Sequence, residues 1–227
     1  MKLKIPFLNM KNYVLLKCYH KNPLVVERAP IVLSNKLSPL KKPEQPVSSF
    51  ATCYGYIASL KRSATIVANT DFEWVVEENN INYNFADPHY GEVEWRHDGD
   101  LVYSTITNKH SPLVVSKIRN FWHLEEDTGV DFVMASHIRN TTAMRIPTGI
   151  LNFKHQHTAA IFNILTWEPQ HHVVNYKTPL VSLHPLTDKP LYVESICDQA
   201  KVEELDIKTT SHPYFSGSCL KLSKNKY

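Results

Sequence analysis

Short runs in which apolar and polar residues alternate recur along this chain, and such alternation is typical of half-buried β-strands. It is clearest at residues 71–76 (DFEWVV) and 80–85 (NINYNF). A β-branched and aromatic run at 12–19 (NYVLLKCY) predicts a further strand, and 23–34 predicts one or two more, interrupted at Pro30. We therefore expect the N-terminal half to be built from strands.

Strand-like runs separated by turn signals continue through the second half, for example on either side of the turn expected at Asp127-Thr128-Gly129. Only residues 191–207 have helical spacing; they contain few helix breakers, and their apolar positions are Val193, Ile196, Ala200 and Leu205. About ten strands and one late helix predict an all-β protein. The architectures that fit are a β-sandwich, a jelly roll or a β-clip-like barrel with one C-terminal helix.

Proline-rich and basic stretches suggest how the chain is organised. Residues 1–37 are expected to hold the N-terminal strands, and 38–49, with three prolines, a solvated connection. Residues 50–190 would form the main β domain, and 191–227 a helix followed by a basic tail. Because all-β chains of this length often fold as a single unit, we predict one structural domain.

Composition narrows the class further. Six glycines and 14 prolines suit strands and loops better than a helical bundle. The net charge of +3 gives no reason to expect nucleic acid as the main partner. The four cysteines are far apart and lack CxxC spacing, which favours reduced thiols in a cytosolic setting. We find no secretory leader and no apolar run near the length of a membrane span, so a soluble cytoplasmic protein is expected.

The stretch 147–157 (PTGILNFKHQH) raises the possibility of a metal site. On a strand, His155 and His157 would share one face about 7 Å apart. A glycine, five residues and then HxH resembles the first cupin motif, and His184 could supply a later ligand. The cupin glutamate is missing, since residues 158–165 (TAAIFNIL) contain no carboxylate. With twelve histidines in the chain, chance pairs are expected, and we predict no metal and no cofactor.

A second metal option is the ligand set of the 2-oxoglutarate oxygenases. His123 and Glu125 would give its HxE motif and His184 the distal ligand, but no arginine follows Arg145 to bind the co-substrate. The acidic run 124–127 (LEED) is more simply interpreted as a solvated strand end. No GxSxG, P-loop or GxGxxG motif is present.

Four segments in order resemble a family of uncharacterised proteins encoded by tailed bacteriophages. They are RNFWHL (119–124), GILNFK (149–154), IFNIL (161–165) and KTPLVSLHPL (177–186). That pattern is in turn similar to the C-terminal strands of dUTPases and dCTP deaminases, which have the β-clip fold. The resemblance places Asn152 and Lys154 where those enzymes carry acids. Because neither can act as a carboxylate base or hold Mg²⁺, the resemblance implies the fold without the nucleotide chemistry.

These observations favour a non-catalytic phage protein, either a virion structural component or an accessory protein, although they leave the question of an enzyme open. It would act through a β-rich surface on other phage proteins or on further copies of itself, in the host cytoplasm during infection or in the virion. The alternatives are a metal-dependent or nucleotide-processing enzyme and a glycan-binding module.

Exposed tryptophans would be needed for the glycan alternative, and the candidates are Trp74, Trp95 and Trp122. Core packing is the more ordinary role for such residues. We also expect the segment after residue 190 to contact a neighbouring subunit and to lie outside the core.

Overall fold

A computed structural model describes residues 12–36, 53–77, 80–87, 92–96, 113–119, 122–140, 142–158, 161–166 and 168–211. Its helices are α1 (Pro23–Arg28), α2 (Tyr54–Lys61), α3 (Gln199–Ser211) and the short 3-10 turn η2 (Ser34–Lys36). The strands are β1 (Val14–His20), β2 (Ile31–Leu33), β3 (Ala64–Val67), β4 (Phe72–Glu77), β5 (Asn80–Phe85), β6 (Glu92–Arg96), β7 (Leu113–Arg119), β8 (His123–Glu125), β9 (Asp131–Ser136), β10 (Gly149–Asn152), β11 (Ile161–Thr166), β12 (Gln170–Val174), β13 (Pro179–Pro185) and β14 (Leu191–Cys197).

The described strands form four sheets. Their orders are β14-β1-β8, β10-β9-β13-β3-β2, β11-β7-β6 and β12-β4-β5. Strands dominate, which confirms the all-β prediction with a C-terminal helix of about three turns. The described part of the chain forms no closed barrel, so the predicted closed β-clip-like barrel is not seen there.

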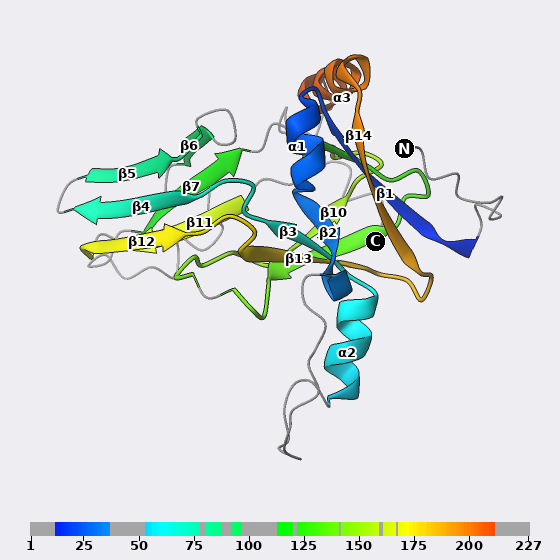
Figure 1. The fold of residues 1–227 in the computed structure, drawn as a ribbon, viewed down its shortest axis with the longest axis horizontal. Coiled ribbons are helices and arrows are strands. Elements are labelled where there is room, and N and C mark those ends of the chain that lie inside the picture. Colours follow the sequence, from blue (N-terminus) through cyan, green and yellow to red (C-terminus); the bar gives the residue numbers. More distant parts are fainter. Residues whose placement is uncertain are drawn as a thin grey trace, which may run out of the picture.

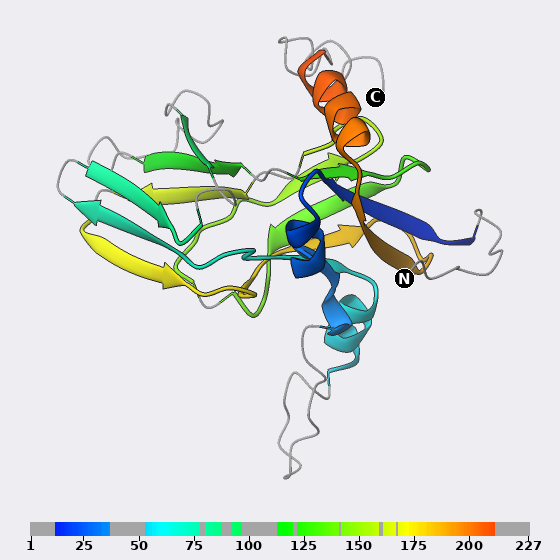
Figure 2. The same ribbon diagram turned by 45° about the horizontal axis from the view of Figure 1, so that its top comes forward.

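The two halves of the molecule are joined by a bent pair of strands. β3 continues into β4 and β12 continues into β13, and the bend is bridged by hydrogen bonds from Ala68 N to Thr178 O (2.9 Å) and from Lys177 N to Ala68 O (2.8 Å). On one side of the bend the β4 and β7 sheets lie over each other, and on the other side lie the five-stranded sheet and the β1 sheet (Figures 1 and 2). A single apolar core that includes Trp74, Trp122 and Phe132 runs through both halves.

Two short helices correct the expectation of strands at 23–34 and of a single helix. α1 forms because Asn22 accepts a hydrogen bond from Leu24 N (2.9 Å) and Pro23 occupies the first helical turn. A cap followed by proline outweighs the β-propensity of the two valines behind it. The helix ends at Arg28, its C-cap residue Ala29 has φ +45°, and β2 then begins at Ile31 as expected. α2 was likewise not expected from the sequence.

The C-terminal helix starts later than its apolar spacing suggested. Residues Leu191–Cys197 form β14, which runs parallel to β1 from Leu191 opposite Val14 to Cys197 opposite His20. α3 begins at Gln199, where the Asp198 side chain accepts from Lys201 N (2.9 Å). Segments that the sequence assigned to separate ends of the chain therefore share one sheet. Leu191 belongs to the main apolar core, so the expectation that the segment after residue 190 lies outside the core is wrong for β14.

No helix within the described ranges is long and apolar enough to cross a membrane. The expected turn at Asp127-Thr128-Gly129 is confirmed, and Gly129 has φ +80°. The proline-rich connection 38–49 and residues 212–227 of the predicted tail lie outside the described residues.

Candidate functional site

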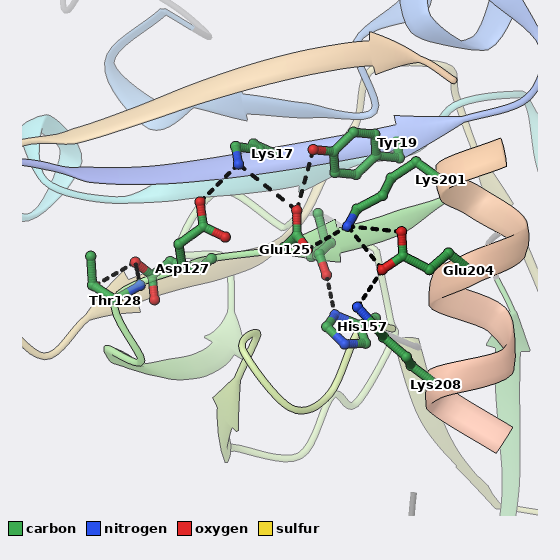
Figure 3. Close-up of polar contacts among 11 residues, drawn as sticks. Lys17, Tyr19, Glu125, Asp127, Thr128, His157, Lys201, Glu204 and Lys208 are labelled. Atoms are coloured by element: carbon green, nitrogen blue, oxygen red, sulfur yellow. Dashed lines mark hydrogen bonds and ion pairs between the residues drawn. The ribbon is translucent and has the colours of Figure 1, made fainter. Parts of the chain in front are cut away.

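Within the described residues, several charged side chains come together where α3 packs across β1 and β8. A small apolar cluster, separate from the main core, lies beneath the helix and consists of Tyr19, Val202 and Leu205 with Ile196 beside them. Leu205 is fully buried in it. Around this cluster runs a belt of ion pairs, which we call the α3 seam; its residues are Lys17, Tyr19, Glu125, Asp127, Lys201, Glu204 and Lys208 (Figure 3).

Glu125 is the centre of the α3 seam. Its carboxylate is 2.9 Å from Lys201 Nζ on α3 and 3.8 Å from Lys17 Nζ on β1. It also accepts a hydrogen bond from the Tyr19 hydroxyl (3.3 Å). Lys17 in turn contacts Asp127 at 2.8 Å. One carboxylate from β8 thus holds groups from both β1 and the C-terminal helix.

Two groups of the seam, Tyr19 and Lys201, have shifted pKa values that favour their ordinary protonation states. Burial first, and then the charge and hydrogen bond of Glu125, raise the pKa of the Tyr19 hydroxyl. Burial disfavours the charge on Lys201, but Glu125 and Glu204 outweigh that effect and raise the pKa of its ammonium group. At neutral pH, Tyr19 is therefore protonated and Lys201 is charged. Neither can act as a nucleophile or base, so the seam is suited to fastening the helix.

Two buried histidines adjoin the seam. His123 on β8 places Nε2 3.2 Å from Asp206 Oδ1, and its Nδ1 is buried without a hydrogen-bond partner. His157 donates from Nδ1 to the Leu124 carbonyl (3.1 Å), and burial lowers the pKa of its imidazole. His123 and Glu125, the predicted HxE pair, are thus engaged with α3.

The structure gives the three candidate metal ligands different surroundings. His155 is exposed in the turn after β10, which ends at Asn152, so the strand on which His155 and His157 would share a face is absent there. His157 is buried next to β8, whereas His184 lies on β13 opposite Val133 of β9. Within the described ranges, no three His, Cys, Asp or Glu side chains are placed to hold a metal ion.

The positions that resemble the nucleotide enzymes serve the local fold. Asn152 donates from Nδ2 to Gly129 O (3.1 Å) and to Asp131 Oδ1 (2.7 Å), and its own Oδ1 accepts from Lys154 N (3.1 Å). The side chain therefore ties the end of β10 to the turn before β9. Lys154 is exposed, and its Cδ lies against Gly129.

Glu126 is a buried acidic residue that the sequence analysis placed in solvent. The run LEED was expected to be solvated, yet Glu126 is only 1% exposed. Its carboxylate accepts from the backbone N–H of Thr128 (2.8 Å), Gly129 (2.7 Å) and Val130 (3.1 Å), and from the Thr128 hydroxyl. A glutamate two residues before a Thr-Gly turn is the signal that could have found it, since its side chain can reach the turn amides.

Two of the three tryptophan candidates for a glycan site are buried. Trp74 and Trp122 are 0% and 1% exposed, respectively, and belong to the core, so neither can stack on a sugar. The side chain of Trp95 lies outside what the structure describes.

Apolar side chains are also exposed on the outer face of the five-stranded sheet. Ile150, 67% exposed, lies opposite Val133, which lies opposite His184. Leu186, 59% exposed, follows β13 and donates from its N–H to Asp131 O (2.8 Å). We call Ile150, Val133, Ala135, His184 and Leu186 the outer strip. Val133, Ala135 and His184 are half-buried, so Ile150 and Leu186 are the exposed apolar side chains of the strip. Exposed apolar side chains that adjoin one another can form a contact site.

The fold and these two features define an all-β protein with a fastened C-terminal helix and an exposed apolar strip on a sheet. Comparison of the chain with protein-family models and with curated proteins gives no match.

Proposed function

We propose that this protein is a non-catalytic component of a tailed bacteriophage, a virion structural or accessory protein that works by contact. Its partners would be other phage proteins or further copies of itself, in the host cytoplasm during infection and in the assembled particle. The resemblance over residues 118–190 to proteins of tailed phages supports the phage assignment.

The outer strip is the observation that carries the proposal of a contact protein. Ile150 and Leu186 expose most of their side-chain surface on a sheet whose opposite face packs on the core. Burying such side chains on a partner removes apolar area from water, at about 25 cal/mol per Å². The strip therefore gives the protein a surface that gains from association.

The chemistry of the polar groups supports a role without catalysis. Tyr19 and Lys201 are held in unreactive protonation states, and the Asn152 amide is engaged by the turn before β9. The buried carboxylate of Glu126 is fully engaged by turn donors. These groups have local structural tasks that account for their burial.

Quantitative mass spectrometry of purified virions tests the proposal. If the protein is a structural component, we expect it at a fixed copy number per particle. If it is an accessory protein, we expect it to be enriched in infected-cell lysate and depleted from particles. Incubation with dUTP and dCTP gives the opposing test. Release of pyrophosphate or ammonia above a no-protein blank, lost on Asn152→Ala and retained by Leu24→Ala on the distant helix α1, would contradict a non-catalytic role.

A further inference from the structure

The C-terminal helix α3 is attached to the rest of the molecule through a contact of its own. Its buried side chains Val202 and Leu205 join Tyr19 in a small apolar cluster that is separate from the main core. The helix follows β14 after a single residue, Asp198, whose N–H donates to His20 O (3.1 Å). Opening of α3 at this point would therefore leave the main core and its sheets in place.

The same contact includes polar groups whose burial works against it. Nδ1 of His123, which faces α3, and the hydroxyl of Thr209 on the helix are buried without a hydrogen-bond partner in the described part of the chain. Such burial is unfavourable, because each group gives up its bonds to water. A cluster of only a few apolar side chains has to offset this cost, so we expect α3 to open more readily than the core.

His157 adjoins this contact and is held by β8. It is 4% exposed; its carbonyl accepts from Leu124 N (2.8 Å), and its Nδ1 donates to Leu124 O (3.1 Å). The imidazole lies beside the side chain of Lys208 on α3, as Figure 3 shows. Because Nδ1 carries the donated proton, the neutral ring has its lone pair at Nε2, and this is the atom to which acid adds a second proton.

We propose that α3 is an acid-sensitive latch, which opens when His157 takes up this second proton while the remainder of the fold stays intact. In the closed form the imidazolium would be buried next to the Lys208 ammonium, and opening relieves both the burial of the charge and the repulsion. The proposal goes beyond the proposed function, since it concerns how the C-terminal helix is held and does not depend on the partner of the outer strip.

The charges that face His157 come from β8 and α3. Burial has the largest effect and lowers the pKa of its imidazole, while the hydrogen bond to Leu124 and the carboxylate of Glu125 raise it. Lys208 and His123 lower it further. The lowering effects prevail, so the ring is neutral in the closed form at pH 7. Because the open form binds a proton more readily than the closed form, acid favours opening.

The other groups near the latch respond to acid in different ways. His123 Nε2 can donate to Asp206 Oδ1 (3.2 Å) whether the ring is neutral or protonated, so this bond does not require deprotonation. His20, whose pKa is lowered by burial, is the imidazole beside His123 on β1, but its Nδ1 accepts from Asn22 N (2.8 Å) next to α1. Hydrogen bonds from two lysines of α3 lower the pKa of Glu204, so it stays ionised at pH 5.5. His157 is therefore the imidazole whose protonation bears on α3.

Amide hydrogen exchange of the full chain at pH 7 and pH 5.5, each corrected for the intrinsic exchange rate at that pH, tests the latch. We expect the opening of residues 199–211 to increase severalfold in acid. The limit over this interval is about eightfold, because the imidazole of the open form has the ordinary pKa of about 6.5. Opening of 199–211 should remain far more frequent than that of β4 and β12, which report on the core.

His157→Asn is the deciding variant, because its amide group can still donate to Leu124 O but cannot take up a proton. It should lose the acid response at 199–211. His171→Gln is the matched control: His171 is exposed on β12, paired with Glu73 (2.7 Å) and away from α3 (Figure 1), so the response should be unchanged. Leu205→Ala should open α3 more at both pH values and keep the ratio between them. Circular dichroism confirms that each variant is folded.

Three results would overturn the latch. The first is a full chain whose opening at 199–211 is equal at pH 7 and pH 5.5. The second is an acid response that persists in folded His157→Asn, because another imidazole, such as His20, would then be responsible. If His157→Asn does not fold, the titration of the His157 ring in the full chain, followed by nuclear magnetic resonance, decides: the ring has to gain its proton over the pH range in which α3 opens, and a mismatch is the third.

Discussion

Replacing Glu126 by alanine is the sharpest test of how the turn between β8 and β9 is held. The carboxylate is 1% exposed and accepts hydrogen bonds from three backbone amides and one hydroxyl. Alanine leaves these donors without their acceptor. Each buried amide donor left without an acceptor costs about 1–3 kcal/mol, whereas the hydroxyl of exposed Thr128 can turn to water. For the three amides we therefore expect a loss in the lower part of the summed range, about 3–5 kcal/mol.

The chain supplies matched controls at the neighbouring positions. The side chain of Asp127 is 58% exposed and forms a surface ion pair with Lys17, so Asp127→Ala should cost no more than about 1 kcal/mol. Glu126→Gln keeps one carbonyl oxygen as acceptor but turns an amide group towards backbone N–H donors. Its cost should therefore lie between those of the two alanine variants.

Urea unfolding of the three variants at pH 7, followed by tryptophan fluorescence, measures these differences. Trp74 and Trp122, which are both buried in the core, make the signal sensitive to loss of the core. A loss of about 4 kcal/mol is a large part of the roughly 5–15 kcal/mol that stabilises a typical domain. If Glu126→Ala and Asp127→Ala shift the midpoint equally, the carboxylate does not hold the turn and the reasoning fails.

Three further predictions concern other parts of the fold. Burial, aided by the charge of Arg139, lowers the pKa of His137 from 6.5 to about 4. Below pH 6.5 the unfolded chain therefore binds a proton that the folded chain does not, so the folded state loses stability as the pH falls from 6.5 towards 4. Between pH 7 and pH 5 the full chain should lose about 1–2 kcal/mol more than His137→Gln in urea unfolding, and equal losses would contradict this. Leu205→Ala removes a fully buried side chain of α3 and should cost about 2 kcal/mol of stability. Amide hydrogen exchange should become faster at residues 199–211, while the exchange rates of β4 and β12 stay unchanged. A uniform loss of protection over all these elements would place α3 in the main core. Gly129→Ala places a Cβ on a backbone with φ +80° and brings it within 3.3 Å of Lys154 Cδ. The variant should therefore be about 1–2 kcal/mol less stable, seen as a lower thermal melting midpoint. An unchanged midpoint would show that the turn adapts.

The residues of the α3 seam could not be assigned from the sequence. Lys17, Glu125 and Lys201 come from β1, β8 and α3, and only the fold brings them within ion-pair distance. The outer strip is similar, because Ile150 and Val133 become neighbours only through the pairing of β10 with β9. Neither feature has a local pattern that marks its function.

Local sequence was sufficient for elements whose cause lies within a few residues. The alternation at 71–76 and 80–85 predicted β4 and β5, and the Asp127-Thr128-Gly129 turn formed as expected. The Asn22 cap and Pro23 that start α1 were also present in the sequence, although the β-branched valines behind them misled the interpretation.

Tertiary structure decided the elements whose cause lies far along the chain. Residues 191–197 have an apolar spacing that suits a helix, but they gain backbone hydrogen bonds as β14 alongside β1, about 175 residues earlier. Glu126 illustrates the same limit on the scale of one side chain, since its neighbours Glu125 and Asp127 have the same charge and a different exposure. A residue type fixes which bonds a side chain can make, whereas its burial and partners are fixed by segments that only the folded chain brings together.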